Sequence, residues 1–200
     1  MARSAFWQGK ILNLPDPCCL AEFVRRAGRA PVSTIRGLSR LTTMAAMTQV
    51  IDVADLASTQ RLGRKLAALL PRGSVVALNG PLGAGKTHFV QAVADGSGID
   101  PADVTSPTFV LLQEYVGNPS IFHFDVYRLK DEDEFLQLGP EEYFDGDGLC
   151  LIEWADKVKQ CLPQEYLQID IEVTGEKSRR FTVTANGESY EWLLPKLAVK

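Results

Sequence analysis

Residues 80–87 read Gly-Pro-Leu-Gly-Ala-Gly-Lys-Thr, and this stretch decides the fold class of the chain. It fits the pattern G-x-x-x-x-G-K-[ST], in which a glycine-rich loop joins a buried strand to a helix. The segment before it, residues 74–79, is short, apolar and partly β-branched, as a buried parallel strand is. Residues 88–94 can continue as a helix. The context therefore predicts a binding site for the phosphates of a nucleoside triphosphate.

The residues of this loop suggest how it would hold ATP and Mg²⁺. The glycines lack a Cβ, so the backbone can adopt positive φ and turn its N–H groups towards the phosphates. Lys86 would place its charge between the β- and γ-phosphates, and the Thr87 hydroxyl would bind Mg²⁺. His88, in the first turn of the helix, is expected at the surface. The predicted nucleotide contacts here are Gly80, Pro81, Leu82, Gly83, Ala84, Gly85, Lys86, Thr87 and His88.

A magnesium site also needs a carboxylate, and two acidic residues follow apolar strands. Glu153 comes after residues 149–152, and Asp125 comes after residues 121–124. Ligands of open α/β sheets collect at the carboxyl ends of the strands, so both positions suit a catalytic or metal-binding acid. A solvated charge or a helix cap is the simpler alternative for each of them.

The order of elements predicts the fold class. Strands alternate with helices along most of the chain, which indicates an α/β layered fold of the P-loop NTPase type, with a mixed, mostly parallel sheet flanked by helices. A helix is expected from Asp55 or Ser58 to Leu70, and an acidic helix from Asp131. The expected strands are residues 49–53, 74–79, 108–115, 121–126, 149–152, 167–173 and 181–184.

Charge divides the chain into two parts. Residues 1–46 contain seven Lys/Arg and two Asp/Glu, whereas residues 47–200 contain fourteen and twenty-three, and the net charge is −4. We interpret residues 1–46 as a basic, disordered extension and residues 47–200 as the ATPase domain. A mispredicted start upstream of Met44 or Met47, a species-specific extension and an organelle transit peptide are the alternatives. An acidic domain is a poor platform for free nucleic acid, so direct tRNA binding is not expected.

Cysteine usage and hydropathy indicate a cytoplasmic protein. The cysteines are Cys18, Cys19, Cys150 and Cys161, with neither a C-x-x-C pair nor histidine spacing that suits zinc. Reduced thiols are therefore expected. No apolar run approaches the ~20 residues of a membrane span, and no secretory signal pattern is found.

Five motifs, taken together and in order, resemble one family. They are residues 80–87, Thr-Ser-Pro-Thr-Phe at 105–109, His-Phe-Asp-Val-Tyr-Arg-Leu at 123–129, Leu-Gly-Pro-Glu-Glu-Tyr at 138–143 and Leu-Ile-Glu-Trp at 151–154. This set is similar to TsaE, formerly YjeE, the bacterial ATPase of tRNA threonylcarbamoyladenosine synthesis. The resemblance covers about residues 48–195 and is far more specific than the glycine-rich loop alone.

The resemblance implies roles for particular residues. It implies Thr87 and Glu153 as Mg²⁺ ligands, and Lys86, Asp125 and Glu153 as catalytic residues, although Asp125 could instead act through a neighbouring group. It also implies a nucleotide-sensing switch loop at Thr105, Ser106 and Thr108, with Trp154 as a functionally sensitive neighbour. Thr59 and Arg180 match positions near the adenine. The chemistry of the residues agrees, because Ser106 precedes a proline and is restricted to extended backbone, which can present hydroxyls to a γ-phosphate.

Several functional alternatives stay open at this point. The resemblance implies an ATPase that drives or resets a TsaB–TsaD complex and meets tRNA only through that complex. A small-molecule kinase or a nucleotide-binding module without hydrolysis would share the same loop. Arg128 could stabilise a transferring phosphoryl group or, as we favour, pair with the acidic stretch 131–134. His123 alternates with Asp125 and could simply be packed.

Overall fold

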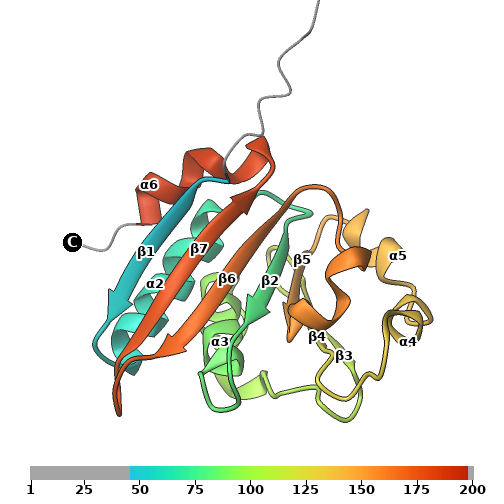
Figure 1. Ribbon diagram of the computed structural model, residues 1–200, viewed down its shortest axis with the longest axis horizontal. Coiled ribbons are helices and arrows are strands. Elements are labelled where there is room, and N and C mark those ends of the chain that lie inside the picture. The colour runs from blue at the N-terminus through green and yellow to red at the C-terminus, as the bar shows by residue number, and fades with distance from the viewer. Residues whose placement is uncertain (1–45, 198–200) are drawn as a thin grey trace, which may run out of the picture. The chain divides into compact units, whose positions relative to one another are not determined.

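A seven-stranded sheet forms the centre of the molecule in the order β1-β7-β6-β2-β5-β4-β3 (Figure 1). The computed structural model describes residues 46–197, so the predictions for the basic extension and for Cys18 and Cys19 lie outside the described residues. The strands are β1 Thr48–Val53, β2 Val75–Asn79, β3 Leu112–Tyr115, β4 Ile121–Asp125, β5 Leu149–Glu153, β6 Tyr166–Val173 and β7 Arg179–Asn186.

The sheet is mixed and mostly parallel, as predicted. Strands β6, β2, β5 and β4 pair in parallel in the middle of the sheet. The pairs β1–β7, β6–β7 and β3–β4 are antiparallel. Because β7 is antiparallel to both of its neighbours, β1 runs in the same direction as the four central strands, and only β7 and β3 run the other way.

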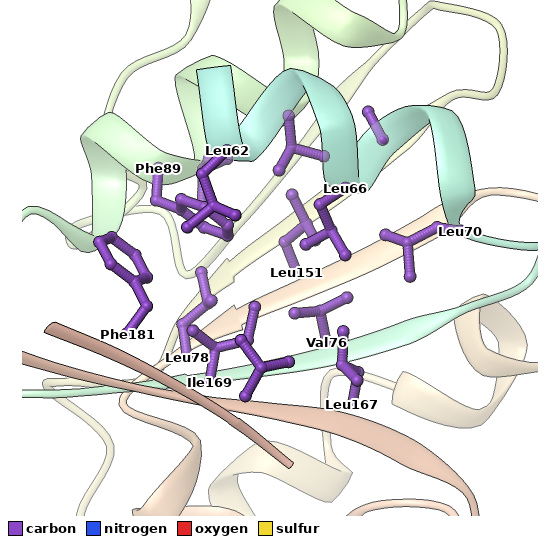
Figure 2. Packing of buried hydrophobic residues seen from close by; sticks show 14 of the residues in the cluster. Leu62, Leu66, Leu70, Val76, Leu78, Phe89, Leu151, Leu167, Ile169 and Phe181 are labelled. Carbon is purple, nitrogen blue, oxygen red and sulfur yellow. The ribbon is translucent and has the colours of Figure 1, made fainter. Parts of the chain in front are cut away.

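Two longer helices, α2 (Leu56–Leu69) and α3 (Lys86–Gly96), pack on one face of the sheet (Figure 1). The Asp55 carboxylate caps α2 by accepting a hydrogen bond from the backbone N–H of Ser58 at 2.7 Å, as the sequence predicts. Leucines of α2 meet Phe89 of α3 and the apolar side chains of β2 and β6 (Figure 2).

The contact between α2 and α3 depends on two glycines. A Cβ on Gly63 would lie 2.4 Å from the Cβ of Ala92, and one on Gly96 would lie 2.6 Å from the Cβ of Ala67. The absent side chains therefore allow the two helices to approach closely. This packing fixes α3, whose first turn carries Lys86 and Thr87, against the sheet.

The other face of the sheet is covered by shorter elements. Strand β2 is buried on both faces: Val76 and Leu78 belong to the core under α2 and α3, while Val75 and Ala77 belong to a second cluster with Phe124 and Phe135. The elements on this face are helices α4 Glu132–Leu136 and α5 Pro140–Phe144 and the 3₁₀ segment Ala155–Cys161. The remaining short elements lie on the side of α2 and α3: helix α6 Leu194–Leu197 and the 3₁₀ segments Pro101–Asp103 and Glu188–Leu193.

One sequence prediction needs correction. Residues 108–111 were expected to begin a strand, but they form a turn in which Val110 and Leu111 donate backbone hydrogen bonds to the carbonyl of Pro107. Leu111 has φ 67°, so the chain cannot continue as an extended strand there. The acidic helix predicted from Asp131 is present and spans Glu132–Leu136.

The cysteines among the described residues fit the prediction of reduced thiols. Cys150 and Cys161 are both free. Cys150 is buried in the sheet, and its burial raises the pKa of the thiol to about 12. The thiolate form of Cys150 is thus disfavoured, as expected for a structural residue.

Candidate functional site

The carboxyl ends of β2, β4 and β5 bring the predicted acids and the glycine-rich loop together. Asp125 and Glu153 are direct partners in the parallel pairing of β4 and β5, so their side chains lie on the same face. Both are buried, with exposed fractions of 2% and 3%. Strand β2 pairs with β5 beside them and leads directly into the glycine-rich loop, residues 80–87.

The backbone of the glycine-rich loop has the conformation that its glycines predict. Gly83 and Gly85 have φ of 77° and 101°, values that other residues rarely adopt. Gly80 has φ 142°, and a Cβ there would lie 2.5 Å from the carbonyl oxygen of Ile171. Helix α3 begins at Lys86, so its unpaired N–H groups and the positive end of its dipole lie at the loop. This arrangement suits an anion.

Lys86 is the buried cation of the loop. Its Nζ donates hydrogen bonds to the carbonyl oxygens of Gly80 at 2.7 Å and Pro81 at 3.1 Å. The same atom lies 3.5 Å from the ring centroid of Trp154, which is a cation–π contact. Burial lowers the pKa of Lys86, and the carboxylates of Glu153 and Asp125 oppose that shift. Among residues 46–197, Lys86 forms no ion pair with a carboxylate, and a phosphate beside Nζ would be a direct anionic partner.

Thr87 and Glu153 lie in hydrogen-bond contact, as expected of two residues that share a metal. The Thr87 hydroxyl donates to Glu153 Oε1 at 2.8 Å, which leaves the lone pairs of Thr87 Oγ1 open to a metal. Among residues 46–197, no group of three or more histidine, cysteine, aspartate or glutamate side chains could hold a metal alone. Magnesium fits such a site, because it takes most of its ligands from water and phosphate oxygens.

Asp125 connects the sheet to the predicted switch loop, residues 105–108. Its Oδ2 accepts hydrogen bonds from the hydroxyls of Ser106, at 2.8 Å, and Thr108. Its Oδ1 accepts the backbone N–H of Tyr127 at 3.0 Å. Asp125 therefore holds the hydroxyls that the sequence predicts as sensors of a γ-phosphate.

Two cavities meet at the glycine-rich loop. One, of about 310 Å³, contains most of the predicted chemistry; its lining residues include Lys86, Thr87, Ser106, Thr108, Asp125, Glu153 and Trp154. The other, of about 500 Å³, is lined by Asp55, Thr59, Lys177 and Arg179. Gly83, Gly85 and His88 line both. An elongated ligand could thus extend across the loop from one cavity into the other.

A comparison with known protein families identifies the family. The family model of the threonylcarbamoyl adenosine biosynthesis protein TsaE matches residues 53–181. The chain belongs to the TsaE family. A relative from Bacillus subtilis (strain 168), named tRNA threonylcarbamoyladenosine biosynthesis protein TsaE, is 45% identical over 70% of this chain and 87% of its own length. A relative of the same name from Treponema pallidum (strain Nichols) is 43% identical over 62% of this chain and 92% of its own length.

A solved structure supports the same fold assignment. The crystal structure of Bacillus subtilis YdiB superposes with a TM-score of 0.65 and 38% sequence identity, and covers 76% of this chain and 95% of the other. The TsaE resemblance carried by the five motifs and the P-loop NTPase-like fold predicted from the order of elements are therefore confirmed.

The structure separates the two TsaE-like positions that were expected near an adenine. Thr59 is buried and lines the 500 Å³ cavity. Arg180 does not line that cavity; its Nε donates to the Asp52 carboxylate at 2.8 Å on the exposed side of β7. The reason is strand alternation, because Phe181 and Arg179 face α2 and α3 while Arg180 faces away. Arg179 lines the cavity instead, and its Nε donates to the carbonyl of Ala84 at 2.9 Å.

Among the described residues, Arg128 does not form the structural ion pair with the acidic stretch 131–134 that the sequence favours. Its guanidinium lies 4.2 Å from the ring centroid of Phe109, next to the switch loop. Within the described part of the chain, Arg128 forms no ion pair with the acidic stretch 131–134, where Glu134 instead lies 3.8 Å from Lys130. Tyr127 lines the smaller cavity and Arg179 the larger one, and no sequence motif had indicated a role for either residue.

A third cavity, of about 500 Å³, lies against the opposite face of the sheet and is lined by Asn79, Gln168 and Asp170. It shares only Gly80, Pro81 and Trp154 with the predicted TsaE-like site residues, and neither Lys86 nor Thr87 lines it.

Among residues 46–197, no helix is long and apolar enough to cross a membrane.

Proposed function

We propose that this protein is a Mg²⁺-dependent ATPase that acts in tRNA threonylcarbamoyladenosine synthesis, where it drives or resets a TsaB–TsaD-type complex. One observation carries the proposal. Thr87 is the last residue of the glycine-rich loop and follows Lys86, and its hydroxyl lies 2.8 Å from Glu153 Oε1. This is the arrangement that would hold Mg²⁺ between a hydroxyl, a carboxylate and the phosphates of ATP.

The cavities support a specific orientation for ATP. The base and ribose would occupy the 500 Å³ cavity beside Thr59 and Arg179, and the triphosphate would cross Gly83 and Gly85. The γ-phosphate and Mg²⁺ would then lie in the 310 Å³ cavity, next to Lys86 and Asp125. Thr87 and Glu153, the proposed Mg²⁺ ligands, line the smaller cavity, and this supports that direction for the triphosphate.

Each residue would have a separate role in hydrolysis. Lys86 would neutralise the β- and γ-phosphates, and Thr87 with Glu153 would orient Mg²⁺, whose positive charge stabilises the transferring phosphoryl group. Asp125 would orient the attacking water or accept its proton, directly or through a neighbouring group. Ser106 and Thr108, which now donate to Asp125, would exchange that carboxylate for the γ-phosphate and return after its release.

Hydrolysis by the isolated protein should be slow. Lys86 and His88 are the basic residues that line the smaller cavity, and the guanidinium of Arg128 contacts Phe109 instead. An arginine beside the transferring phosphoryl group accelerates related reactions by ~10³- to 10⁵-fold. We propose that a partner completes the site, as expected if hydrolysis resets a protein complex in the cytoplasm.

A product analysis tests the reaction. Purified protein is incubated with ATP and Mg²⁺, alone and with TsaB and TsaD proteins and tRNA. Free phosphate supports the ATPase, a phosphorylated acceptor would support a small-molecule kinase, and binding without any product would support a nucleotide-dependent interaction module. Glu153→Gln keeps the shape of the side chain but removes its charge, so the Mg²⁺ dependence of ATP binding and the rate of hydrolysis should both fall.

A truncated protein that begins at Met47 tests the role of the basic extension. If tRNA is reached only through the complex, the truncated protein should bind ATP and support tRNA modification like the full chain. A defect in modification at low salt that disappears at high salt, with normal ATP binding, would instead indicate an RNA-recruiting role for residues 1–46.

A further inference from the structure

His123 is a fully buried histidine on β4, two residues before Asp125 and on the same face of the strand. Its Nε2 lies 2.9 Å from Glu153 Oε1, while its Nδ1 is buried and has no hydrogen-bond partner. A carboxylate oxygen only accepts hydrogen bonds, so the contact requires the hydrogen on Nε2. Because Nδ1 faces no acceptor, the ring can use only its Nε2–H, and that group is aimed at Glu153.

Glu153 accepts two hydrogen bonds on one carboxylate oxygen. Thr87 Oγ1 donates to Oε1 at 2.8 Å, and His123 Nε2 donates to the same atom at 2.9 Å. No hydrogen bond to Oε2 is found within residues 46–197. The two donors therefore fix the rotation of the carboxylate and leave Oε2 for a metal ion or its bound water.

Tyr115 packs against His123 and also contacts the switch loop. Its ring centroid lies 6.3 Å from that of His123, within the range of packed aromatic rings. The hydroxyl of Tyr115 accepts the backbone N–H of Thr105 at 3.2 Å and donates to the carbonyl oxygen of Thr105 at 3.1 Å. Tyr115 thus holds the first residue of the switch loop through two backbone contacts.

We propose that His123 and Tyr115 form a buried positioning pair, which holds the Glu153 carboxylate at one end and the start of the switch loop at the other. This inference rests on the proposed function, because it assigns the pair to the binding of Mg²⁺ and ATP. Neither residue would touch the nucleotide. His123 would set the direction of Glu153 Oε2, and Tyr115 would set the position from which Ser106 and Thr108 reach the γ-phosphate.

Substitution of His123 tests the first half. His123→Leu removes the donor, His123→Asn keeps a shorter polar side chain whose amide does not reach Glu153, and His123→Gln returns an N–H close to the position of Nε2. ATP affinity is measured by calorimetry with Mg²⁺ and with a chelator. We expect His123→Leu and His123→Asn to reduce the Mg²⁺-dependent gain in affinity about tenfold or more, as loss of a partner of a metal ligand does. His123→Gln should keep most of that gain, and the affinity in chelator should not change in any of the variants.

Thermal unfolding of the same variants separates positioning from packing. A purely structural His123 would lower the melting temperature in all three variants and leave the Mg²⁺-dependent gain unchanged in those that fold, and this result would overturn the proposal. Equal weakening with and without Mg²⁺ would overturn it as well. The Gln and Asn variants keep the test decisive if His123→Leu does not fold.

Tyr115→Phe tests the second half, because it keeps the ring and removes only the hydroxyl. The hydroxyl makes two hydrogen bonds, and the net loss of one corresponds to about fivefold, so we expect the ratio of ATP to ADP affinity to fall about fivefold or more, with the Mg²⁺-dependent gain largely kept. An unchanged ratio would contradict the role of Tyr115. If the unmodified protein shows no Mg²⁺-dependent ATP binding, both the proposed function and this inference are wrong. If it shows such binding and the His123 variants have the same Mg²⁺-dependent gain in affinity as the unmodified protein, only the inference is wrong.

Discussion

The glycine-rich loop and the switch loop line the same cavity, but they are held in different ways. The glycine-rich loop continues from the central strand β2 into helix α3, and backbone bonds close it, such as that from Ala84 N–H to the carbonyl of Pro81 at 3.1 Å. The switch loop lies outside the sheet, and its hydroxyls and first residue are held by the side chains of Asp125 and Tyr115. The first loop is preorganised, whereas the second can be released by the loss of a few hydrogen bonds.

This difference suggests a division of roles. A preorganised anion site binds phosphates without a conformational cost, so the glycine-rich loop should determine affinity. A segment held by few contacts can adopt two arrangements, so the switch loop should determine turnover and the signal to a partner. Substitutions in the two loops should therefore affect different measurements.

The largest effect is expected on turnover, from Asp125→Asn. The amide keeps the shape of the side chain but loses the charge that would orient the attacking water and one acceptor for the hydroxyls of Ser106 and Thr108. Turnover should fall by ~10²- to 10⁴-fold while ATP binding is retained. Single-turnover hydrolysis and calorimetry measure the two quantities, with the exposed Asp147→Asn as the matched control. Hydrolysis at the parental rate would make Asp125 a structural residue.

The next effect is expected on affinity, from Lys86→Ala. This substitution removes the only lysine of the cavity that holds Thr87 and Glu153, so ATP affinity should fall about 10- to 100-fold, since a hydrogen bond to a charged group contributes ~1.5–3 kcal/mol. The fold should persist, because the charge belongs to the site and not to the apolar core. Lys130→Ala, at an exposed surface pair, is the control. Unchanged ATP affinity would refute the role of the glycine-rich loop.

The sequence predicted the glycine-rich loop better than the switch loop, for a physical reason. Positive φ at Gly83 and Gly85 requires glycine, so the backbone conformation is visible in the residue types. The residues after Pro107 are apolar and β-branched, as in a strand, but local hydrogen bonds to its carbonyl turn the chain at Leu111. Such a turn depends on a competition between local and sheet hydrogen bonds, which residue types do not reveal.

The sequence predicted which acids end the strands, but it predicted only in part which face of the sheet each side chain points to. Asp125 and Glu153 each follow an apolar strand, which the sequence shows, and the two strands pair in a register that makes these acids direct neighbours. The adenine contact of Arg180 stays a prediction, and Arg179 was given no role, although alternation with the buried Phe181 would have placed it on the inner face. The same alternation relates His123 to Asp125, but its contact with Glu153 depends on the pairing of β4 with β5, which the sequence does not contain.

A smaller, pH-dependent effect should separate the charge of Lys86 from the shape of its loop. Burial lowers its pKa below the ordinary value of ~10.4, so folded protein loses this proton before unfolded protein does. Within that alkaline window the free energy of unfolding should rise with pH, while ATP affinity should fall because the phosphates need the ammonium. Thermal unfolding and calorimetry measure both trends. In Lys86→Ala the contribution of this residue to both should vanish, and a trend that persists would assign it to other groups.

The smallest effect is expected from two adjacent arginines that the strand directs to opposite faces. Arg179→Ala removes the hydrogen bond from Nε to the carbonyl of Ala84 and a positive charge from the 500 Å³ cavity, so ATP affinity should fall about fivefold, the value of one net hydrogen bond. Arg180→Ala breaks only the exposed pair with Asp52 and should leave affinity unchanged. Calorimetry of the two variants compares positions that differ by one residue. If Arg180→Ala weakens ATP binding and Arg179→Ala does not, the base and ribose do not occupy the cavity beside Thr59, and the glycine-rich loop does not depend on Arg179 for its shape.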